Sequence, residues 1–597
     1  MLLWWPVWLG LILSPRPVSF DLPDTAGMRH SSAELAGNKA TVLVFVATDC
    51  PISNAYAPEL NRLYEEYSPQ GVGFLAVHSD PAVSAEEVGH HAREFGFRFP
   101  TLLDRNQVLA RQTGAKVTLE VALLSPAARL LYRGRVDDRY ADFGKARPAA
   151  RRQDLRAALD EILAGRTVSQ PETRSLGCAI PFRQTAKTSA VTFTRDIAPI
   201  LYRHCTGCHH PGEVAPFSLL SYEEAAKRAG LIARVTASRY MPPWLPEPGY
   251  GHFRGERRLT AAEIDKIRIW AEAGAPHGDG ADMPAPPTYP KGWRMGPPDL
   301  VLRMPKPFAV AADGPDVYEC FVVPSGLTED RYVRAAEFRP GDRSVVHHGL
   351  FLLDAMGAAR RNGMQYPCFG APGFLPSGGL GGWTPGSSPI QMPDGVSIPI
   401  RKGSDLILQI HYHPIGKAGS DQSTLALYFA SRPPEKRVVD IGLVSRDIDI
   451  PAGAADYRVR DHFTTPVDVV AIGIIPHAHY VCKEMKGWAI LPNGRKQWLI
   501  WIRDWDFNWQ DQYHYATPMH FPAGTRFEME FSYDNSATNP RNPNHPPRRV
   551  VWGPSSTDEM AGLHLQVVPE RMSDLEELGQ ALWGKVMRSV GGGFYRR

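Results

Sequence analysis

Six residues in the second half of the chain have the types and spacing of copper ligands. His477 and His479 are two positions apart, so in a β-strand their imidazoles point to the same face. A thioether beside two imidazoles favours copper(I) over zinc or magnesium, and Met560 is the candidate sulfur ligand. The pattern therefore predicts two copper sites. Their ligands would be His347, His348, His411, His477, His479 and Met560.

The first of these predicted sites contains two adjacent histidines, His347 and His348, together with His411. Neighbouring residues point to opposite faces of an ideal strand. Both imidazoles therefore reach one metal only if the strand twists or if one ring binds through Nδ1. The alternative interpretation of each single histidine is a surface residue or a hydrogen-bonded core residue.

A second redox motif is Cys205-Thr206-Gly207-Cys208-His209, which has the spacing of a c-type haem attachment sequence. Two thiols on one helical turn would bind the haem covalently, and His209 would reach the iron. Met241 is the candidate sixth ligand, because the prolines that follow it would hold its loop rigid, and a methionine ligand raises the reduction potential. The alternative is a zinc site or a disulfide at Cys205 and Cys208. His204, His210 and His252 are alternative ligands.

A third candidate is the thiol of Cys50, which lies between a predicted buried strand, 41–46, and an amphipathic helix, 55–68. A helix N-terminus lowers the pKa of a thiol. The second cysteine of a C-x-x-C motif is replaced by Ser53, so Cys50 alone would form a sulfenic acid, with Cys178 as the candidate resolving thiol. The alternative is an inactive domain kept as a scaffold.

Length and composition place limits on these interpretations. A chain of 597 residues is too long for one core and predicts about three to five domains. The apolar content of 43% and charged content of 22% are those of a globular protein. The net charge of +3 gives no argument for nucleic-acid binding, and we expect none.

The first 13 residues are almost entirely apolar, which suits a secretory leader over residues 1–19. The run is shorter than the roughly 20 residues that span a bilayer. Haem attachment also implies export, so we expect a periplasmic or secreted protein. The leader has no Lys or Arg at its start and no clean cleavage site. The alternatives are a buried strand and an uncleaved anchor that associates the chain peripherally with a membrane.

Seven cysteines bound the disulfide content. Haem would use two, which leaves an odd number and at least one unpaired or transiently paired thiol. Cys320, Cys368 and Cys482 are the candidates for one structural disulfide, and their pairing is open.

Pattern changes along the chain predict its domains. Alternating strands and helices predict an α/β sandwich first, a small all-α unit follows, and short alternating strands with Pro-Asn-Gly-type turns predict two β-sandwiches. The expected boundaries are 1–19 leader, 20–165 α/β domain, 166–190 polar linker, 191–280 helical unit, 281–300 Pro-rich linker, 301–440 and 441–572 β-sandwiches, and 573–597 helical tail.

The first domain resembles the thioredoxin-like redoxins related to alkyl hydroperoxide reductase, over roughly 140 residues. The matching segments are Phe45–Pro51 and Tyr132–Asp138. Two residues depart from the family pattern: Ser53, already noted, and Leu119, which stands where the family places a proline opposite the active site. The helical unit resembles class I-like cytochrome c domains of multidomain bacterial proteins, which implies one covalent haem.

The stretch 301–570 resembles the copper type II, ascorbate-dependent monooxygenases, the group of peptidylglycine α-hydroxylating monooxygenase and dopamine β-hydroxylase. The matching segments, in the family's order, are Val346–His348, Gly382–Gly386, Leu408–Tyr412, His477–His479 and Ser556–Met560. The resemblance implies two jelly-roll-like sandwiches and two copper ions. By that resemblance the first three histidines bind the electron-transfer copper, and His477, His479 and Met560 bind the copper that meets O₂.

Departures from the peptide-amidating branch narrow the substrate. That branch holds its substrate carboxylate with an arginine, an asparagine and a tyrosine, whose places are taken here by Ile475, Gly562 and His564. We therefore expect a small organic substrate rather than a peptide C-terminus.

These observations lead to one main hypothesis with two alternatives. The main hypothesis is an exported monooxygenase that hydroxylates a C–H bond with O₂, with electrons relayed by the haem from an ascorbate-like reductant or a redox protein. The alternatives are a thiol peroxidase or disulfide oxidoreductase that uses Cys50, and a non-enzymatic haem and copper electron carrier.

Overall fold

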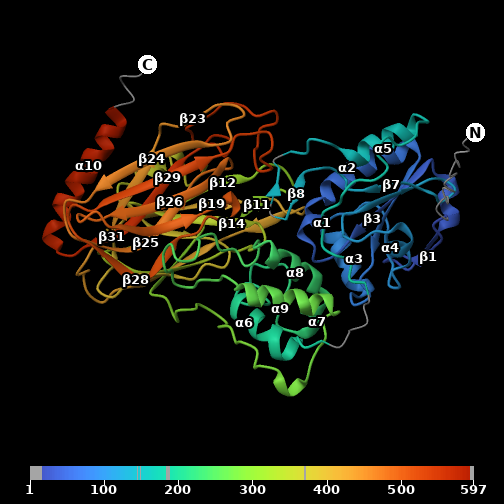
Figure 1. The fold of residues 1–597 in the computed structure, drawn as a ribbon, viewed down its shortest axis with the longest axis horizontal. Coiled ribbons are helices and arrows are strands. Elements are labelled where there is room, and N and C mark those ends of the chain that lie inside the picture. Colours follow the sequence, from blue (N-terminus) through green and yellow to red (C-terminus); the bar gives the residue numbers. More distant parts are fainter. Residues whose placement is uncertain (1–16, 144, 148, 183–188, 369–371, 592–597) are drawn as a thin grey trace, which may run out of the picture. The chain divides into compact units, whose positions relative to one another are not determined.

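The computed structural model describes residues 17–591 except 144, 148, 183–188 and 369–371 (Figure 1). The chain divides into two compact units: residues up to 139 with 150–184, and residues 140–149 with 185 onwards. We describe each unit by itself. Among the described residues, no helix is both long enough and apolar enough to cross a membrane.

The first unit is built on a five-stranded sheet in the order β5-β4-β3-β6-β7. The first three strands pair in parallel and the last two join antiparallel. The strands are β3 (Ala40–Val46), β4 (Val72–His78), β5 (Thr101–Leu103), β6 (Val121–Leu124) and β7 (Leu130–Gly134), with a small ladder of β1 (Asp21–Pro23) and β2 (Arg29–Ser31). The helices are α1 (Pro51–Ala55), α2 (Ala57–Tyr67), α3 (Ala85–Glu94), α4 (Val108–Thr113) and α5 (Asp154–Leu163).

These elements confirm the expected α/β sandwich. Every residue of β3 is buried, as expected for a central strand covered on both faces. Ser84 caps α3 and forms a capping box with Glu87. Tyr67 of α2 donates to Asp160 of α5 at 2.6 Å, so these two helices lie side by side.

The boundaries of the first unit differ from those expected. Residues 171–182 were expected in a polar linker, but they pack on this unit because Thr173 and Ile180 bond to its strands and loops. Most of the expected leader lies outside the described residues. Val18 is in the core and its N–H donates to Ala128, so the domain begins before residue 20.

The second unit begins with a helical segment, residues 191–280. It contains a π-helical turn (Phe193–Ile197), α6 (Ala198–His204), α7 (Tyr222–Lys227), α8 (Ala229–Ala237) and α9 (Ala261–Glu272). Thr260 caps α9 and forms a capping box with Glu263, the local pattern that starts a helix. The helices pack around the fully buried Trp270. The Pro-rich stretch that follows is not a free linker, since Tyr289 stacks on His210 with 3.8 Å between ring centroids.

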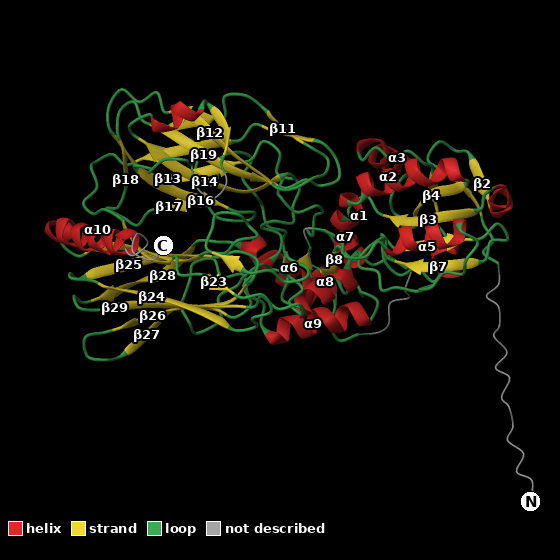
Figure 2. Ribbon diagram, turned by 90° about the horizontal axis from the view of Figure 1, so that it is seen from above, coloured by secondary structure: helices red, strands yellow, loops and turns green. Residues whose placement is uncertain are grey.

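Two β-sheet domains follow, and in Figure 2 their strands form two separate stacks. The first domain has one sheet of β10 (Leu300–Arg303), β21 (Thr424–Phe429), β13 (Arg331–Arg339), β17 (Ile390–Gln391) and β18 (Ile398–Ile400). Its other sheet has β15 (Gln365–Pro367), β12 (Val317–Pro324), β19 (Asp405–Tyr412), β14 (Val346–Asp354) and β16 (Gly378–Trp383). A short ladder joins β11 (Phe308–Val310) to β20 (Gly419–Asp421). One core cluster contains residues of both larger sheets, as in a β-sandwich.

The second β domain is also a sandwich around one core. One sheet has β22 (Val439–Ser445), β31 (Ala561–Pro569), β25 (Val469–His477) and β28 (Tyr513–Phe521). The other has β24 (Tyr457–Thr464), β29 (Arg526–Tyr533), β26 (Cys482–Ile490) and β27 (Lys496–Ile502). A small ladder joins β23 (Asp449–Ile450) to β30 (Val550–Val551), and α10 (Leu575–Gly591) forms the tail. Outside this domain, a separate ladder joins β8 (Tyr140–Asp142) to β9 (Lys145–Ala146) in the second unit.

The structure answers the open question of the disulfide. Cys320 of β12 and Cys368, just after β15, form the bond, because β12 pairs with β15 and brings the two residues within 5.6 Å at Cα. Cys482 is buried and remains a thiol.

Candidate functional sites

Cys50 lies at the N-terminal end of α1, fully buried, with hydrogen-bond donors on its sulfur. The Thr118 hydroxyl donates to Sγ at 2.9 Å, and the Ser53 N–H donates at 3.5 Å. Burial alone raises the pKa of this thiol. Hydrogen bonds from Cys178, Thr118 and Ser53 outweigh burial and lower the pKa to about 7. These hydrogen bonds therefore favour the thiolate form of Cys50.

Cys178 comes to Cys50 from the segment that was expected to be a linker. The Thr118 N–H donates to the Cys178 carbonyl at 2.8 Å, and the Cys178 N–H donates to the Thr118 hydroxyl at 3.1 Å. The Cys178 side chain hydrogen-bonds to Cys50. Two cysteines that are far apart in sequence are thus in contact, the buried Cys50 and the half-buried Cys178, so Cys178 can serve as the second thiol that Ser53 does not supply.

The backbone conformation at Leu119 explains why this position departs from the redoxin pattern. Its φ is +61°, a left-handed conformation that bulky residues rarely adopt. Its N–H donates to the carbonyl of Phe45 in β3 at 2.5 Å. Proline fixes φ near −65° and has no N–H. The local backbone therefore requires a residue other than proline here.

The residues of the haem motif lie directly after α6. Cys205 and Cys208 follow α6 as two thiols, and burial raises the pKa of Cys205 to about 12. The Nδ1 of His209 lies 3.0 Å from the Phe217 carbonyl, so Nδ1 carries the proton and Nε2 is left for a metal. Met241 follows α8, where its N–H donates to Val235.

The three histidines of the first predicted copper site converge. A β-bulge in β14 falls between Val346 and His348, and this irregularity turns His347 and His348 toward the same partner, His411 of β19. The three Nδ1 atoms are 3.1–3.2 Å apart in every pair. Burial is the main cause that lowers the pKa of His347, to about 3, so the ring is neutral.

These distances fit a metal ion. Imidazole nitrogens about 2.0 Å from a tetrahedral metal lie about 3.3 Å from one another. Three neutral imidazoles that point their Nδ1 atoms at one another cannot all be satisfied by hydrogen bonds, whereas one cation accepts all three lone pairs. The sequence predicted that these three histidines converge, but not that all three present Nδ1.

Asp316 orients this cluster, and sequence reasoning missed it. Its carboxylate accepts from Nε2 of His411 at 2.8 Å and from Nδ1 of His413 at 2.8 Å. This bond fixes the proton of His411 on Nε2 and leaves Nδ1 as the lone pair for a metal. Tyr318 stacks on the same ring, with centroids 4.1 Å apart. Asp316 directly precedes β12, and no other marker in the sequence pointed to it.

The two histidines of the second predicted copper site carry their proton on Nδ1, the opposite tautomer from that of His411. Nδ1 of His477 lies 2.6 Å from Gln510 Oε1, and Nδ1 of His479 lies 3.2 Å from the Asp558 carbonyl. Both contacts place the proton on Nδ1 and leave Nε2 as the metal-binding atom. The two rings are close, with centroids 5.2 Å apart.

The Glu559 carboxylate links the backbone of Met560 to that of His479. One carboxylate oxygen, Oε1, accepts from the N–H of both His479 and Met560. Met560 directly precedes β31, in which Gly562 is paired with His477. The structure therefore brings the backbones of all three predicted ligands to one end of the sheet. Burial raises the pKa of Glu559 to about 8.

The helical segment contacts both β domains. Arg257 donates to the Gly386 carbonyl at 3.0 Å and to Asp511 at 2.9 Å. Tyr240, beside Met241, packs edge-on against Trp509 with centroids 6.1 Å apart. Trp509 precedes Gln510, which bonds to His477, so a short chain of contacts joins the helical segment to the second histidine pair.

Comparison with known proteins supports the prediction that the first unit is a thioredoxin-like redoxin domain. Residues 16–132 match the AhpC/TSA family. The thiol-disulfide oxidoreductase ResA of Geobacillus kaustophilus is 38% identical over 92 residues, 15% of this chain and 51% of that protein. ResA of Halalkalibacterium halodurans is 33% identical over 91 residues, 15% of this chain and 49% of that protein. The chain thus spans about half the length of the curated relatives it matches.

Two solved structures are similar to part of the chain. A hypothetical protein from Sinorhizobium meliloti 1021 is 30% identical, with 30% of this chain and 97% of that chain covered and a TM-score of 0.27. An uncharacterized conserved protein from Geobacillus kaustophilus is also 30% identical, with coverage of 29% and 93% and a TM-score of 0.27. The family match lies within the first unit. The protein is therefore a multidomain chain whose N-terminal unit is a thioredoxin-like redoxin domain, followed by β-sheet domains.

Proposed function

We propose that the first unit catalyses thiol–disulfide exchange with Cys50 as nucleophile and Cys178 as resolving thiol. The observation that carries this proposal is the hydrogen bond between the two thiols, together with a Cys50 pKa of about 7. The likeness to thiol-disulfide oxidoreductases supports it. Among the three hypotheses drawn from the sequence, this alternative has better support from the comparisons than the monooxygenase.

The proposed reaction has two steps. The Cys50 thiolate attacks one sulfur of a substrate disulfide, forms a mixed disulfide and releases the other substrate sulfur as a thiolate. Cys178 then loses its proton and attacks Cys50 Sγ, which releases the second substrate thiolate and leaves a Cys50–Cys178 disulfide. The substrate disulfide gains two electrons and the protein dithiol loses two. An external dithiol restores the starting state.

The test uses reduction of a small aromatic disulfide by the full-length protein. Cys50→Ser should abolish turnover. Cys178→Ser should stop after one equivalent and accumulate a mixed disulfide on Cys50, visible by mass spectrometry. Cys482→Ser, which removes a buried thiol of the second unit, is the control and should turn over normally. Unchanged turnover in Cys50→Ser would contradict the proposal.

A second candidate function, copper-dependent monooxygenation, is favoured by the convergence of three Nδ1 atoms at 3.1–3.2 Å. His347, His348 and His411 would hold one copper, and His477, His479 and Met560 would hold the other. Copper bound at these residues would supply one-electron transfer and O₂ activation for hydroxylation of a C–H bond in a small organic substrate. Asp316, Gln510 and the Asp558 carbonyl fix the tautomers that such binding needs.

The same candidate assigns a role to the helical segment. Cys205, Cys208 and His209 would hold a c-type haem, with Met241 as the sixth ligand, and the haem would supply one-electron transfer. The contacts of Tyr240 with Trp509 and of Gln510 with His477 support a role as relay. An ascorbate-like reductant or a redox protein would be the external donor.

Export of the chain is part of this proposal. Disulfides such as Cys320–Cys368 form in oxidising compartments. The apolar run at the N-terminus supports the same location, the periplasm or the exterior.

Metal analysis of protein expressed with export and haem-maturation functions tests the second candidate. It predicts two coppers and one haem per chain, and O₂ consumption with a C–H substrate that His479→Ala abolishes and Cys50→Ser does not. The thiol proposal predicts the reverse dependence for disulfide reduction. Copper and haem without O₂ consumption would favour the non-enzymatic electron carrier.

A further inference from the structure

Residues 171–182, here called the strap, pack on the first unit, and Cys178 within the strap hydrogen-bonds to Cys50. The two ends of the strap are fixed to the unit. The Pro171 carbonyl accepts from Arg133 N–H at 2.9 Å, and the Thr173 N–H donates to the Arg133 carbonyl at 3.1 Å. At the other end, Gln107 donates to the Pro181 carbonyl at 2.7 Å.

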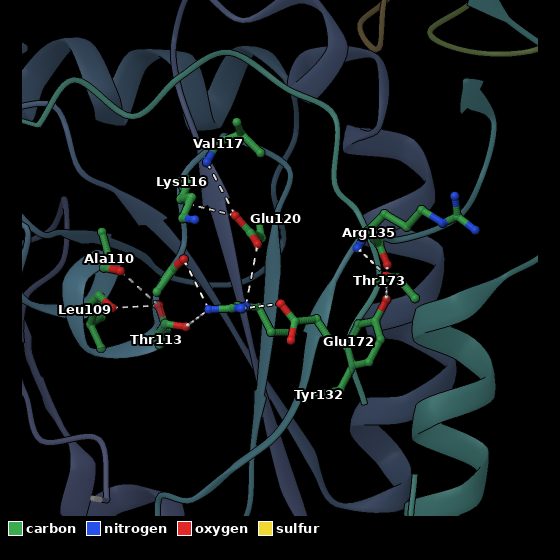
Figure 3. A network of polar contacts seen from close by, with 12 residues as sticks. Leu109, Ala110, Thr113, Lys116, Val117, Glu120, Tyr132, Arg135, Glu172 and Thr173 are labelled. Carbon is green, nitrogen blue, oxygen red and sulfur yellow. Dashed lines mark hydrogen bonds and ion pairs between the residues drawn. The ribbon is translucent and has the colours of Figure 1, made fainter. Parts of the chain in front are cut away.

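The first end of the strap is held by side chains as well as backbone. Figure 3 shows Thr173 between Tyr132 and Arg135, and Glu172 beside it. The Tyr132 and Thr173 hydroxyls are 2.7 Å apart, and the Arg135 N–H donates to the Thr173 hydroxyl at 3.0 Å. Glu172 forms an ion pair with Arg133. This end is therefore a firm anchor.

The middle of the strap lies against the loop before β6 as a short antiparallel pair. Val117 and Ala179 form a bridge, and the Ile180 N–H donates to the Lys116 carbonyl at 2.9 Å. The facing loop is fixed in its turn, since Glu120 accepts from the backbone of Lys116 and Val117 (Figure 3). With the strap in place the exposed fraction of Cys50 is 0%.

Gly177 is the point of closest approach. A Cβ added at this residue would lie 1.9 Å from the Thr118 carbonyl oxygen, a distance that no real Cβ contact shows. The strap therefore closes over Cys50 only because residue 177 has no side chain.

We propose that the strap is a built-in cover: its middle must leave the 116–118 loop before an external disulfide reaches Cys50, and a Cys50–Cys178 disulfide locks it shut. This inference rests on the proposed exchange function and adds its regulation. Reduction of the disulfide removes the covalent link and leaves the middle of the strap held by hydrogen bonds, among them those to Lys116, Thr118 and Cys50, so opening is confined to the dithiol form.

Opening also exposes a binding edge. The Thr118 N–H and the Lys116 carbonyl, which the strap occupies when closed, become free to pair with another extended backbone. The partner that fits is an extended polypeptide with a disulfide at the position that Cys178 occupies in the closed form.

The test is a variant that cannot close. In Gly177→Ala, the iodoacetamide reaction of Cys50 in the reduced full-length protein, followed by peptide mapping, should be at least about tenfold faster than in the wild type. The measurement is made at pH 9.5, where the thiolate predominates with or without the Cys178 hydrogen bond, so the rate reports access. Gly37→Ala is the control, because a Cβ there meets nothing within 4 Å. It should react as slowly as the wild type.

A second variant guards against misfolding of the first. Thr173→Val removes the hydroxyl that Tyr132 and Arg135 contact, keeps the side-chain shape, and should speed the reaction of Cys50 by a smaller factor. Equal rates in all four proteins would overturn the cover. Faster alkylation of Cys50 in Gly177→Ala, in a protein that never forms the Cys50–Cys178 disulfide, would support the proposal that the strap is a cover but contradict the proposed exchange function.

Discussion

After the Cys178 thiol, the Thr118 hydroxyl should be the main side-chain donor that keeps Cys50 ionised. It donates to Sγ at 2.9 Å. A hydrogen bond to a charged group contributes about 1.5–3 kcal/mol, and one pH unit of pKa corresponds to about 1.4 kcal/mol. Thr118→Val keeps the side-chain shape and should raise the pKa of Cys50 from about 7 by roughly one to two pH units.

The direction of the pH dependence follows from the lowered pKa. The ionised Cys50 contributes stability that is fully present above its ordinary pKa of 9.0 and is lost as the pH falls through about 7. Alkylation of Cys50, followed by peptide mapping, should therefore be half-maximal near pH 7 in the wild type and near pH 8–9 in Thr118→Val. The pH of the half-maximum reports the pKa, and the plateau at high pH reports access.

A matched control separates the hydroxyl at Cys50 from any buried threonine. Thr113 is buried in the same unit, and its hydroxyl donates to the Leu109 carbonyl at 2.7 Å (Figure 3) rather than to Cys50. Thr113→Val should leave the titration of Cys50 unchanged. If Thr118→Val and the wild type titrate at the same pH, the hydroxyl does not stabilise the thiolate and the reasoning is wrong.

Three further predictions follow from single contacts. Asp316→Asn should weaken copper binding at the three-histidine cluster about 10–100-fold in a chelator competition, because His411 loses the carboxylate that fixes its tautomer; unchanged affinity would contradict this. Leu119→Pro, which restores the family residue, should destabilise the first unit by about 3 kcal/mol or more in denaturant unfolding, since proline lacks the N–H that bonds to Phe45 and cannot adopt a positive φ. Cys320→Ser should lower the free energy of unfolding of the first β domain by about 4 kcal/mol, given the sequence separation of 48 residues. Unchanged stability, both in this variant and after reduction of the native disulfide, would contradict the prediction.

The sequence was most informative where local patterns repeat. The buried run at β3, the amphipathic α2 and the Thr260 cap of α9 all lie where periodicity and capping rules put them. These features depend on neighbours within a few residues, so a single sequence contains them.

Long-range pairing limited the prediction of the sites. The shared face of His347 and His348 depends on a bulge in β14 whose register is set by β19. The apposition of Cys178 to Cys50 depends on backbone pairing of the strap, which has no periodic signal of its own. Asp316 is an ordinary loop residue until the fold places its carboxylate between two imidazoles.

The most direct measurement is a disulfide map of the full-length protein after oxidation by one equivalent of a small disulfide. The account predicts a single new crosslink between Cys50 and Cys178, reversed by a dithiol, with Cys320–Cys368 unchanged. Recovery of Cys178 as a free thiol while Cys50 is oxidised would contradict it.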